Sequence, residues 1–528
     1  MKSNIIKYIF IAFAIFIIGF AIYKINYENK DEEQQVENTV ETKQVTESIL
    51  NIGISDFDNI NPLITDNQDI IRLSTILYEP LLEITQDYGI ENRLASEWSK
   101  LDATTYLVKL KDNLKWEDGT ALTGSDVKFT IEKLKEGKSA YSDNVKNIKS
   151  VEIIDGNTLR LELKEEEPFF EYNLIFPIVS SNQFKDEKNF YKSRLAPIAT
   201  GMYKVTAATK DSMELSKNEN WFDANNTELK IDKISLTFYD TMGDVYNSLK
   251  IGNIDFICTS KTNVKDYIGT IGFNTTKYKG RDLDFISFNC SEGPLADKEV
   301  RKAINYAIDK KKINSSVFSN NNYVSSFPLD YGSYLYNKEG SSDYNKEKAK
   351  ETLENAGWEY RYGYWRKTEN YNTEYLNIDL VVDSSNSSRV KVAEEIEKQL
   401  EDIGINVYVY RVSNSSYKQY LENKNYEMII TGISNGYSPD LTYFFGDDNI
   451  ANYNNEEMKN ILNEVKNISD QNTLKEKYNR IVEIYEDEMP YVCLYRNIDK
   501  VVYSIRVTGN IVPNIYTVYN NFETWYRQ

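Results

Sequence analysis

Apolar side chains in the last third of the chain switch repeatedly between a helical and a strand period, which limits the available folds. Residues 389–404, RVKVAEEIEKQLEDIG, carry one apolar stripe and end at a glycine, as helices commonly do. Strand patterns follow in residues 405–412, INVYVYRV, and in residues 426–433, YEMIITGI. Because helices and strands alternate here, the sequence predicts an α/β fold in which helices cover a sheet.

Two further helical patterns precede this region. Val300 and Ile304 repeat at helical spacing after Asp297, which is therefore a plausible N-cap. Residues 345–356 form another helical pattern, and Gly357 follows it at a C-cap position. A chain of 528 residues is long enough for two or three domains with sizeable cores.

The stretch KWEDGTALTGSDVKFTIEKL, residues 115–134, has the features of a structural brace. Asp118 and Gly119 supply a turn, because glycine accepts positive φ without steric cost. Thr123 stands three residues before Asp126, close to a capping box, and an apolar helical stripe follows. We therefore predict that this stretch shapes the fold and does not bind the ligand.

Composition excludes several classes of function. The net charge of -19 would repel phosphate backbones and there is no basic patch, so we expect no nucleic-acid partner. The chain has no histidine, which removes the commonest metal ligand and general base together with every Ser-His or Cys-His catalytic arrangement. We therefore expect a protein that is not an enzyme.

The three cysteines, Cys258, Cys290 and Cys493, lie too far apart in sequence for a CxxC motif. Their odd number argues against a full disulfide framework, and we expect them to be buried as small apolar side chains. The sequence therefore predicts neither a bound metal nor a cofactor.

The N-terminal residues 1–24 combine lysines with a long apolar run, MKSNIIKYIFIAFAIFIIGFAIYK. Neither an A-x-A-like cleavage site nor a lipid-accepting cysteine follows, so we expect an uncleaved membrane anchor. The lysines on its short flank favour the cytoplasmic side, which places the folded part on the extracytoplasmic face. A cleaved signal of unusual sequence is the alternative. Residues 25–47 are mostly polar and acidic and should form a flexible tether.

Seven segments in order resemble one family. The stretch at residues 115–134 resembles the Trp-x-Asp-Gly and Asp-Val signature of the family 5 extracellular solute-binding proteins, the oligopeptide- and dipeptide-binding receptors of ABC importers. Six more segments resemble the family's motifs: NINPLITDNQDIIRLSTILYEPLLEI, ATGMYKV, NENWFDANNTELKIDKISLTFY, SLKIGNIDF, FNCSEGPLADKEVRKAINYAIDKKKI and YNKEKAKETLENAGW. The order of the segments makes the resemblance far more specific than any one of them.

The resemblance implies a two-lobed α/β fold of the periplasmic-binding-protein type, type II and of the large peptide-binding class. The first lobe of this fold carries an extra subdomain, and both chain ends return to that lobe. We expect a membrane segment at 1–24, a tether at 25–47, subdomain one of the first lobe at 48–85, 198–288 and 493–528, subdomain two at 86–197, and the second lobe at 289–492.

The resemblance also implies candidate site residues around MIITGISNGYSPDLTYFF, residues 428–445. In peptide-binding members, the ligand backbone pairs with exposed main chain here, and an aspartate binds the ligand's amine. Alignment places that aspartate at Gly436 and the family's tryptophan at Ile433, and it places the carboxylate-binding arginine of dipeptide-binding members at Asp383. We expect these ligand-binding residues: Gly432, Ser434, Asn435, Tyr437, Asp440 and Asp383.

Two functions are compatible with this resemblance. The first is the substrate-binding protein of an ABC importer, which captures a peptide or similar small solute between two closing lobes and presents it to the permease and ATPase subunits. The second is a membrane-anchored surface sensor for a peptide-like ligand, without transport. In either case, we expect a monomer.

Overall fold

The computed structural model describes residue 19 and residues 47–336 and 344–528. The predicted membrane segment 1–24 and tether 25–47 lie outside the described residues, except for Gly19 and Glu47. Every helix in the described ranges is too short or too polar to cross a bilayer. Residues 48–528 form one compact unit.

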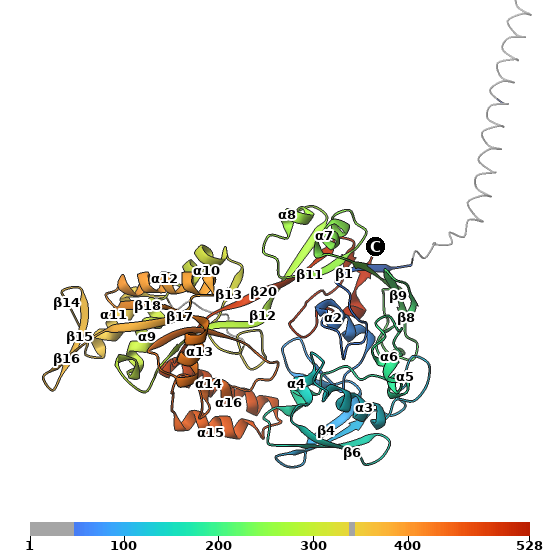
Figure 1. The fold of residues 1–528 in the computed structure, drawn as a ribbon, viewed down its shortest axis with the longest axis horizontal. Helices are drawn as coiled ribbons and strands as arrows, with labels where there is room; N and C mark the ends of the chain where they lie inside the picture. The colour runs from blue at the N-terminus through green and yellow to red at the C-terminus, as the bar shows by residue number, and fades with distance from the viewer. Residues whose placement is uncertain (1–18, 20–46, 337–343) are drawn as a thin grey trace, which may run out of the picture. The chain divides into compact units, whose positions relative to one another are not determined.

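A mixed sheet of eleven strands runs through this unit (Figure 1). In space the strands follow the order β18, β17, β19, β12, β20, β11, β1, β10, β9, β8, with β13 added to β20. Their bounds are β1 Ile49–Ser55, β8 Tyr203–Ala208, β9 Ser212–Lys217, β10 Lys233–Tyr239, β11 Phe256–Thr259, β12 Phe273–Phe288, β13 Asn322–Val324, β17 Asn377–Asp383, β18 Asn406–Val412, β19 Met428–Ser434 and β20 Tyr491–Ser504.

The long antiparallel strands β12 and β20 connect two lobes. The first half of β12 pairs only with β20, near β11, and its second half, residues 282–288, also pairs with β19. A break in register between Lys279 and Leu283 separates these halves. One hydrophobic core is built mainly from residues 283–495 and another from residues 50–278 and 501–525. This two-lobed α/β architecture is the one that the sequence predicted.

A separate antiparallel sheet of four strands supplies the extra subdomain of the first lobe. Its order is β4, β5, β7, β6, and its bounds are β4 Ala95–Lys100, β5 Thr105–Leu110, β6 Ile148–Ile153 and β7 Thr158–Leu163. The remaining strands form small sheets: β2 Leu82–Ile84 with β3 Ile90–Asn92; β14 Glu359–Arg361 with β15 Tyr364–Glu369 and β16 Asn372–Tyr375; and β21 Val507–Thr508 with β22 Tyr526–Arg527. The domain boundaries expected from the sequence stay predictions.

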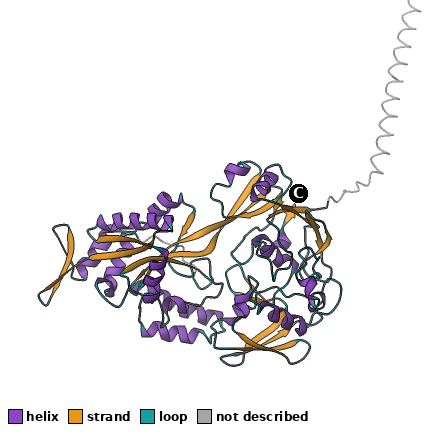
Figure 2. Cartoon of the chain, viewed as in Figure 1, coloured by secondary structure: helices purple, strands orange, loops and turns teal. Residues whose placement is uncertain are grey.

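Helices accompany the strands throughout residues 48–528 (Figure 2). Their bounds are α2 Gln68–Leu77, α3 Gly124–Leu134, α4 Ser142–Val145, α5 Ser181–Phe184, α6 Glu187–Phe190, α7 Met242–Lys250, α8 Lys265–Ile268, α9 Lys298–Ala307, α10 Lys310–Phe318, α11 Lys346–Asn355, α12 Ser387–Glu401, α13 Asn414–Asn423, α14 Thr442–Phe445, α15 Glu456–Val465 and α16 Gln471–Glu488. Three short 3-10 turns occupy Phe170–Asn173, Pro294–Ala296 and Phe522–Thr524.

The predicted helix starts follow from local hydrogen bonds. The Asp297 side chain accepts a hydrogen bond from the backbone N–H of Glu299 and caps α9. That helix ends at Ala307, and the next one starts immediately because Asp309 caps α10 through the N–H of Lys312. Each side chain satisfies an N–H that a helix end leaves unpaired.

The stretch 115–134 is built as a brace, as predicted. The Trp116 ring is only 2% exposed and belongs to the core of the first lobe. Gly119 has φ of 82°, a conformation that favours glycine. Thr123 and Asp126 form a reciprocal capping box at the start of α3. None of these residues lines the large cavity of the protein.

Candidate functional site

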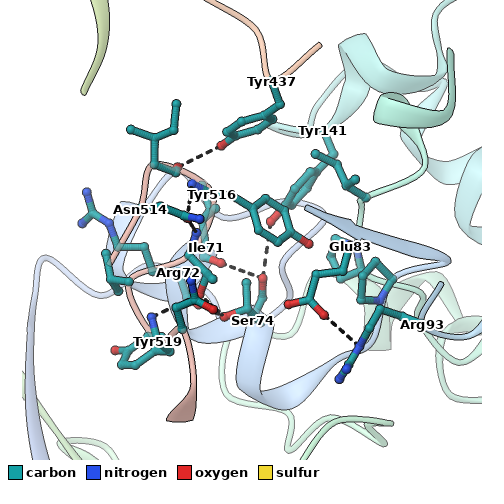
Figure 3. Close-up of a pocket in the computed structure, with 18 of the residues that line it drawn as sticks. Ile71, Arg72, Ser74, Glu83, Arg93, Tyr141, Tyr437, Asn514, Tyr516 and Tyr519 are labelled. Atoms are coloured by element: carbon teal, nitrogen blue, oxygen red, sulfur yellow. Dashed lines mark hydrogen bonds and ion pairs between the residues drawn. The ribbon is translucent and has the colours of Figure 1, made fainter. Parts of the chain in front are cut away.

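A cavity of about 1060 Å³ lies among α2, the β2–β3 hairpin, the start of α4, the loop 514–523, the middle of β12 and the end of β19 (Figure 3). Most of its walls come from the first lobe. The second lobe contributes Ser434 at the end of β19 and Gly436, Tyr437 and Ser438 in the loop that follows. A smaller cavity of about 560 Å³ shares Gln68, Arg72 and Asp499 with it. A volume near 1000 Å³ is at the upper end of the range for small-molecule sites.

Negative charge predominates on the walls of the large cavity. Its four cationic residues are Arg72, Arg93, Lys146 and Arg281. Its nine carboxylate residues are Glu79, Glu83, Glu91, Asp143, Glu167, Asp223, Asp282, Asp499 and Glu523. Because a cavity lined by one sign of charge concentrates ions of the other sign, the walls favour a ligand that carries positive charge.

The β2–β3 hairpin positions Glu83 on the cavity wall. Leu82 and Ile84 on either side of it are buried in hydrophobic cores, so strand alternation turns the carboxylate to the opposite face. Glu83 lies directly opposite Glu91 in the antiparallel pairing. Opposed like charges destabilise a strand pair, so this arrangement costs the fold some stability.

Arg93 is shared between two carboxylates. Its Nε lies 2.9 Å from Oε2 of Glu79 and 2.9 Å from Oε2 of Glu83, and its Nη2 donates to Oε1 of Glu79 at 2.9 Å. Oε1 of Glu79 also accepts a hydrogen bond of 2.6 Å from the indole N–H of Trp221. Glu79 is therefore fully bonded, whereas no hydrogen-bond donor in residues 47–336 and 344–528 reaches Oε1 of Glu83.

Burial raises the pKa of the Glu83 carboxyl to about 7, and the charge of Arg93 only partly opposes this. The neighbouring carboxylates Glu79, Glu91 and Glu523 raise the pKa further. Glu83 therefore changes its charge near neutral pH, and a cation in the cavity would favour its ionised form.

Three tyrosines on the cavity walls lie near one another (Figure 3). Tyr437, in the loop after β19, donates a hydrogen bond to the carbonyl oxygen of Ile515 at 3.2 Å. Its ring meets the Tyr516 ring edge to face, with 5.7 Å between the centroids. The Tyr141 hydroxyl lies 3.4 Å from Oγ of Ser74. Figure 3 shows the Glu83 side chain beside the Tyr516 ring. Burial raises the pKa of Tyr516 well above its ordinary value, and the charge of Glu83 raises it further.

Two of the sequence-predicted site residues, Ser434 and Tyr437, line the cavity, as does Gly436 between them. Asn435 instead holds the loop in place: its N–H donates to the carbonyl of Arg281 at 3.1 Å, and its side-chain amide donates to the carbonyl of Pro328 at 2.8 Å. The Arg281 Nε returns a hydrogen bond to the Asn435 carbonyl at 2.6 Å.

Gly432 lies outside the cavity lining, and its lack of a side chain has a steric reason. A Cβ there would lie 2.2 Å from Nη2 of Arg389, 2.4 Å from Oδ1 of Asp284 and 2.9 Å from the carbonyl oxygen of Leu283. Arg389 and Asp284 form an ion pair of 2.6 Å across this point. The edge of β19 that faces away from β12 pairs with β17 only at Met428 and Ile429. Beyond Ile429, no strand of the described chain pairs with this edge of β19.

Asp383 and Asp440 also lie outside the cavity lining and bond within the protein. Asp383 accepts hydrogen bonds from Ser385 and from the Asn414 amide at 2.6 Å. Burial opposes ionisation of Asp383, but these bonds outweigh it and the pKa is lowered. Oδ1 of Asp440 accepts from the N–H and the hydroxyl of Thr442, at 2.9 and 2.6 Å. The ligand-binding roles expected for both residues stay predictions.

Residues 432–436, GISNG, have the G-x-S-x-G spacing of a hydrolase nucleophile elbow, but their context differs. In such enzymes the serine lies on a sharp turn from a strand into a helix and is paired with a histidine. Here β19 leads into a loop, and the chain has no histidine. Ser434 therefore lacks the partner that this chemistry needs.

In the described ranges, no three carboxylate or thiol side chains cluster as a metal site.

The three cysteines remain free thiols, of which Cys493 is buried and Cys258 and Cys290 are half-buried.

Sequence reasoning missed Glu83, Tyr141 and Tyr516 as residues of the cavity wall. A signal for Glu83 was present, because a lone carboxylate between buried leucine and isoleucine in a strand must face away from the core.

Residues 89–455 match the family described as bacterial extracellular solute-binding proteins, family 5 middle, and this match covers more than two thirds of the chain. The chain belongs to this family. It is an extracellular solute-binding protein of family 5, as the sequence motifs predicted.

Curated relatives match along most of their length. The oligopeptide-binding protein AppA of Bacillus subtilis (strain 168) is 25% identical over 461 residues, which cover 82% of this chain and 83% of that protein. Heme-binding protein A of Haemophilus influenzae is 24% identical over 496 residues, which cover 85% of this chain and 87% of that protein.

Among solved structures, the unliganded open form of MppA, a periplasmic murein tripeptide-binding protein, has a TM-score of 0.77 at 17% sequence identity. The likeness covers 91% of this chain and 98% of that chain, and it supports the two-lobed fold.

Proposed function

We propose that this chain captures a peptide or a peptide-like small solute in the large cavity and delivers it to the permease and ATPase subunits of an importer. The observation that carries this proposal is a cavity lined both by the first lobe and by Ser434 and residues 436–438 of the second. A ligand that contacts both lobes stabilises their closed arrangement, since those contacts exist together only when the lobes are closed. The names of AppA and MppA, an oligopeptide-binding and a tripeptide-binding protein, support a peptide-like solute.

The unpaired edge of β19 suits the main chain of such a solute. A peptide that adds as a strand beside Gly432 and Ser434 would satisfy the free backbone groups of that edge, and the backbone would be bound with little regard to side-chain sequence. In this proposal Tyr437 lines the bound solute and Asn435 fixes the loop that carries it. The sequence-based proposal that Asp383 or Asp440 receives the solute's amine is tested by the variants Asp383→Asn and Asp440→Asn.

We infer that the protein binds its solute without transforming it. The cavity offers carboxylates, arginines and tyrosines, but the chain lacks the histidine that would act as a general base at neutral pH. We also propose that the apolar run in residues 1–24 holds the folded part at the extracytoplasmic face of the membrane and that the protein acts as a monomer. Mass measurement of the membrane-bound chain tests the anchor, and light scattering tests the monomer.

The proposed function is tested by identifying the solute that the protein carries. The full chain is purified in mild detergent and then denatured, and the released small molecules are analysed by mass spectrometry. We expect a peptide or a peptide-like amine in near-stoichiometric amount. Release of haem or a metal complex in that amount would contradict the proposal.

A further inference from the structure

The cavity contains a group of aromatic rings near the incompletely bonded carboxylate of Glu83. Tyr141 comes from the start of α4, Tyr516 from the C-terminal loop and Tyr437 from the second lobe. Figure 3 shows these three side chains together, with Glu83 between the Tyr516 ring and Arg93. The face of a tyrosine ring carries negative charge and attracts ammonium groups.

Charge accounting around Glu83 points to a missing cation. The single guanidinium of Arg93 is divided between Glu79 and Glu83, and Glu91 stands directly opposite Glu83. Glu79 accepts hydrogen bonds from Nε and Nη2 of Arg93 and from the Trp221 N–H. Arg93 therefore neutralises the charge of Glu79 more fully than that of Glu83. Its Oε1 and the hydroxyl of Tyr516 both lack a hydrogen-bond partner in the part of the chain that the structure describes.

We propose that Glu83, together with the rings of Tyr141 and Tyr516, forms the subsite that binds an organic ammonium group of the captured solute. This inference rests on the proposed function and names the chemistry of its ligand. An ammonium group placed there donates to Oε1 of Glu83 and to the Tyr516 oxygen, while the rings surround its remaining surface.

The elevated pKa of Glu83 agrees with this assignment, because burial and the facing carboxylates Glu79, Glu91 and Glu523 disfavour its charge in the empty cavity. A bound cation supplies the missing positive charge. The ammonium has two possible sources, the amino terminus of a peptide or a cationic side chain, which the experiment distinguishes.

The assignment also explains how the protein manages without the family's aspartate at position 436. The carboxylate comes from the first lobe. Tyr437 of the second lobe holds Arg281 over its ring, and it adjoins the subsite through its contact with the Tyr516 ring and its hydrogen bond to the Ile515 carbonyl.

Isothermal titration calorimetry of the full chain in detergent tests the subsite with four probes. Ala-Lys-Ala offers both ammonium sources, N-acetyl-Ala-Lys-Ala offers only the side chain, and N-acetyl-Ala-Ala-Ala offers none. Methylammonium offers the cation and its N–H donors without a peptide. We expect at least tenfold weaker binding of N-acetyl-Ala-Ala-Ala than of Ala-Lys-Ala, and the middle probe identifies the source.

The same titrations on Glu83→Gln should show at least tenfold weaker binding of the ammonium probes, with no change for N-acetyl-Ala-Ala-Ala. Glu97→Gln is the matched control, because it removes one negative charge at a glutamate that does not line the cavity and whose side chain is 73% exposed. It should change affinity less than threefold. A melting curve for each variant establishes that it is folded.

Equal affinity for N-acetyl-Ala-Ala-Ala and Ala-Lys-Ala, or unchanged affinity of the ammonium probes in Glu83→Gln, overturns the subsite while peptide capture survives. Binding of methylammonium alone, lost in Glu83→Gln, supports the subsite and removes peptide capture. Binding of none of the four probes overturns both.

Discussion

Replacement of Glu83 by glutamine should make the ligand-free protein more stable, and the gain should grow as the pH rises. On folding, burial raises the pKa of this carboxyl from its ordinary value of 4.5 to about 7. The folded state therefore binds the proton more tightly than the unfolded state. The contribution of this group to stability is full below pH 4.5 and is lost as the pH rises through about 7.

The size of the effect follows from the difference between the folded and unfolded pKa of Glu83. A tenfold change in proton affinity corresponds to about 1.4 kcal/mol, so ionised Glu83 should lower the free energy of unfolding by about 2 to 3 kcal/mol between pH 5 and pH 8. The Glu83 side chain is 26% exposed, so solvent screening places the effect at the lower end of this range.

Urea unfolding of the full chain and of Glu83→Gln at pH 5 and pH 8 measures this directly. Because the amide does not titrate, the variant's advantage should be about 2 kcal/mol larger at pH 8 than at pH 5. Glu97→Gln, at a glutamate whose side chain is 73% exposed, is the control and should show no such difference. An equal effect of Glu83→Gln at the two pH values would refute the reasoning.

Three other substitutions test the assigned roles of residues. Gly432→Ala should destabilise the protein by about 1 to 3 kcal/mol in urea unfolding, because its Cβ collides with the Arg389–Asp284 ion pair and the Leu283 carbonyl; unchanged stability would show that the strand has room there. Trp116→Ala should cost about 3 to 5 kcal/mol, while the fraction that stays folded binds solute normally by calorimetry; lost binding at unchanged stability would make this stretch part of the site. Asp383→Asn should weaken solute binding less than threefold, since its carboxylate is bonded to Ser385 and Asn414; a tenfold loss would restore the sequence-based assignment.

Local features of the fold were predictable because their causes are local. The cap at Asp297 and the capping box of Thr123 and Asp126 each involve residues three or fewer positions apart, and the structure forms both. The helix and strand patterns in residues 389–433 depend on the period of apolar side chains, which the sequence displays directly. Family motifs added the two-lobed arrangement, which no local pattern specifies.

The cavity walls were only partly predictable because distant segments build them. Ile515 accepts from Tyr437 and donates its N–H to the hydroxyl of Tyr88, a residue 427 positions earlier. Alignment pointed to the loop after β19, where Ser434 and Tyr437 line the cavity, and their binding of a ligand stays a prediction. It could not indicate Glu83, whose position depends on the pairing of β2 with β3 and on the fold that packs around this hairpin.

The central claim is that the solute binds in the cavity shared by the two lobes, and filling that cavity tests it most directly. Gly436 lines the cavity, and a Cβ there would have the Ser438 nitrogen at 3.9 Å as its nearest neighbour, so the chain accepts a side chain at this position. Calorimetry compares Gly436→Trp with Gly156→Trp, a control at an exposed glycine with open space around it. For the solute recovered from the native protein, Gly436→Trp should lose at least tenfold in affinity, whereas Gly156→Trp should bind like the native chain. Native affinity in a folded Gly436→Trp variant would contradict the account.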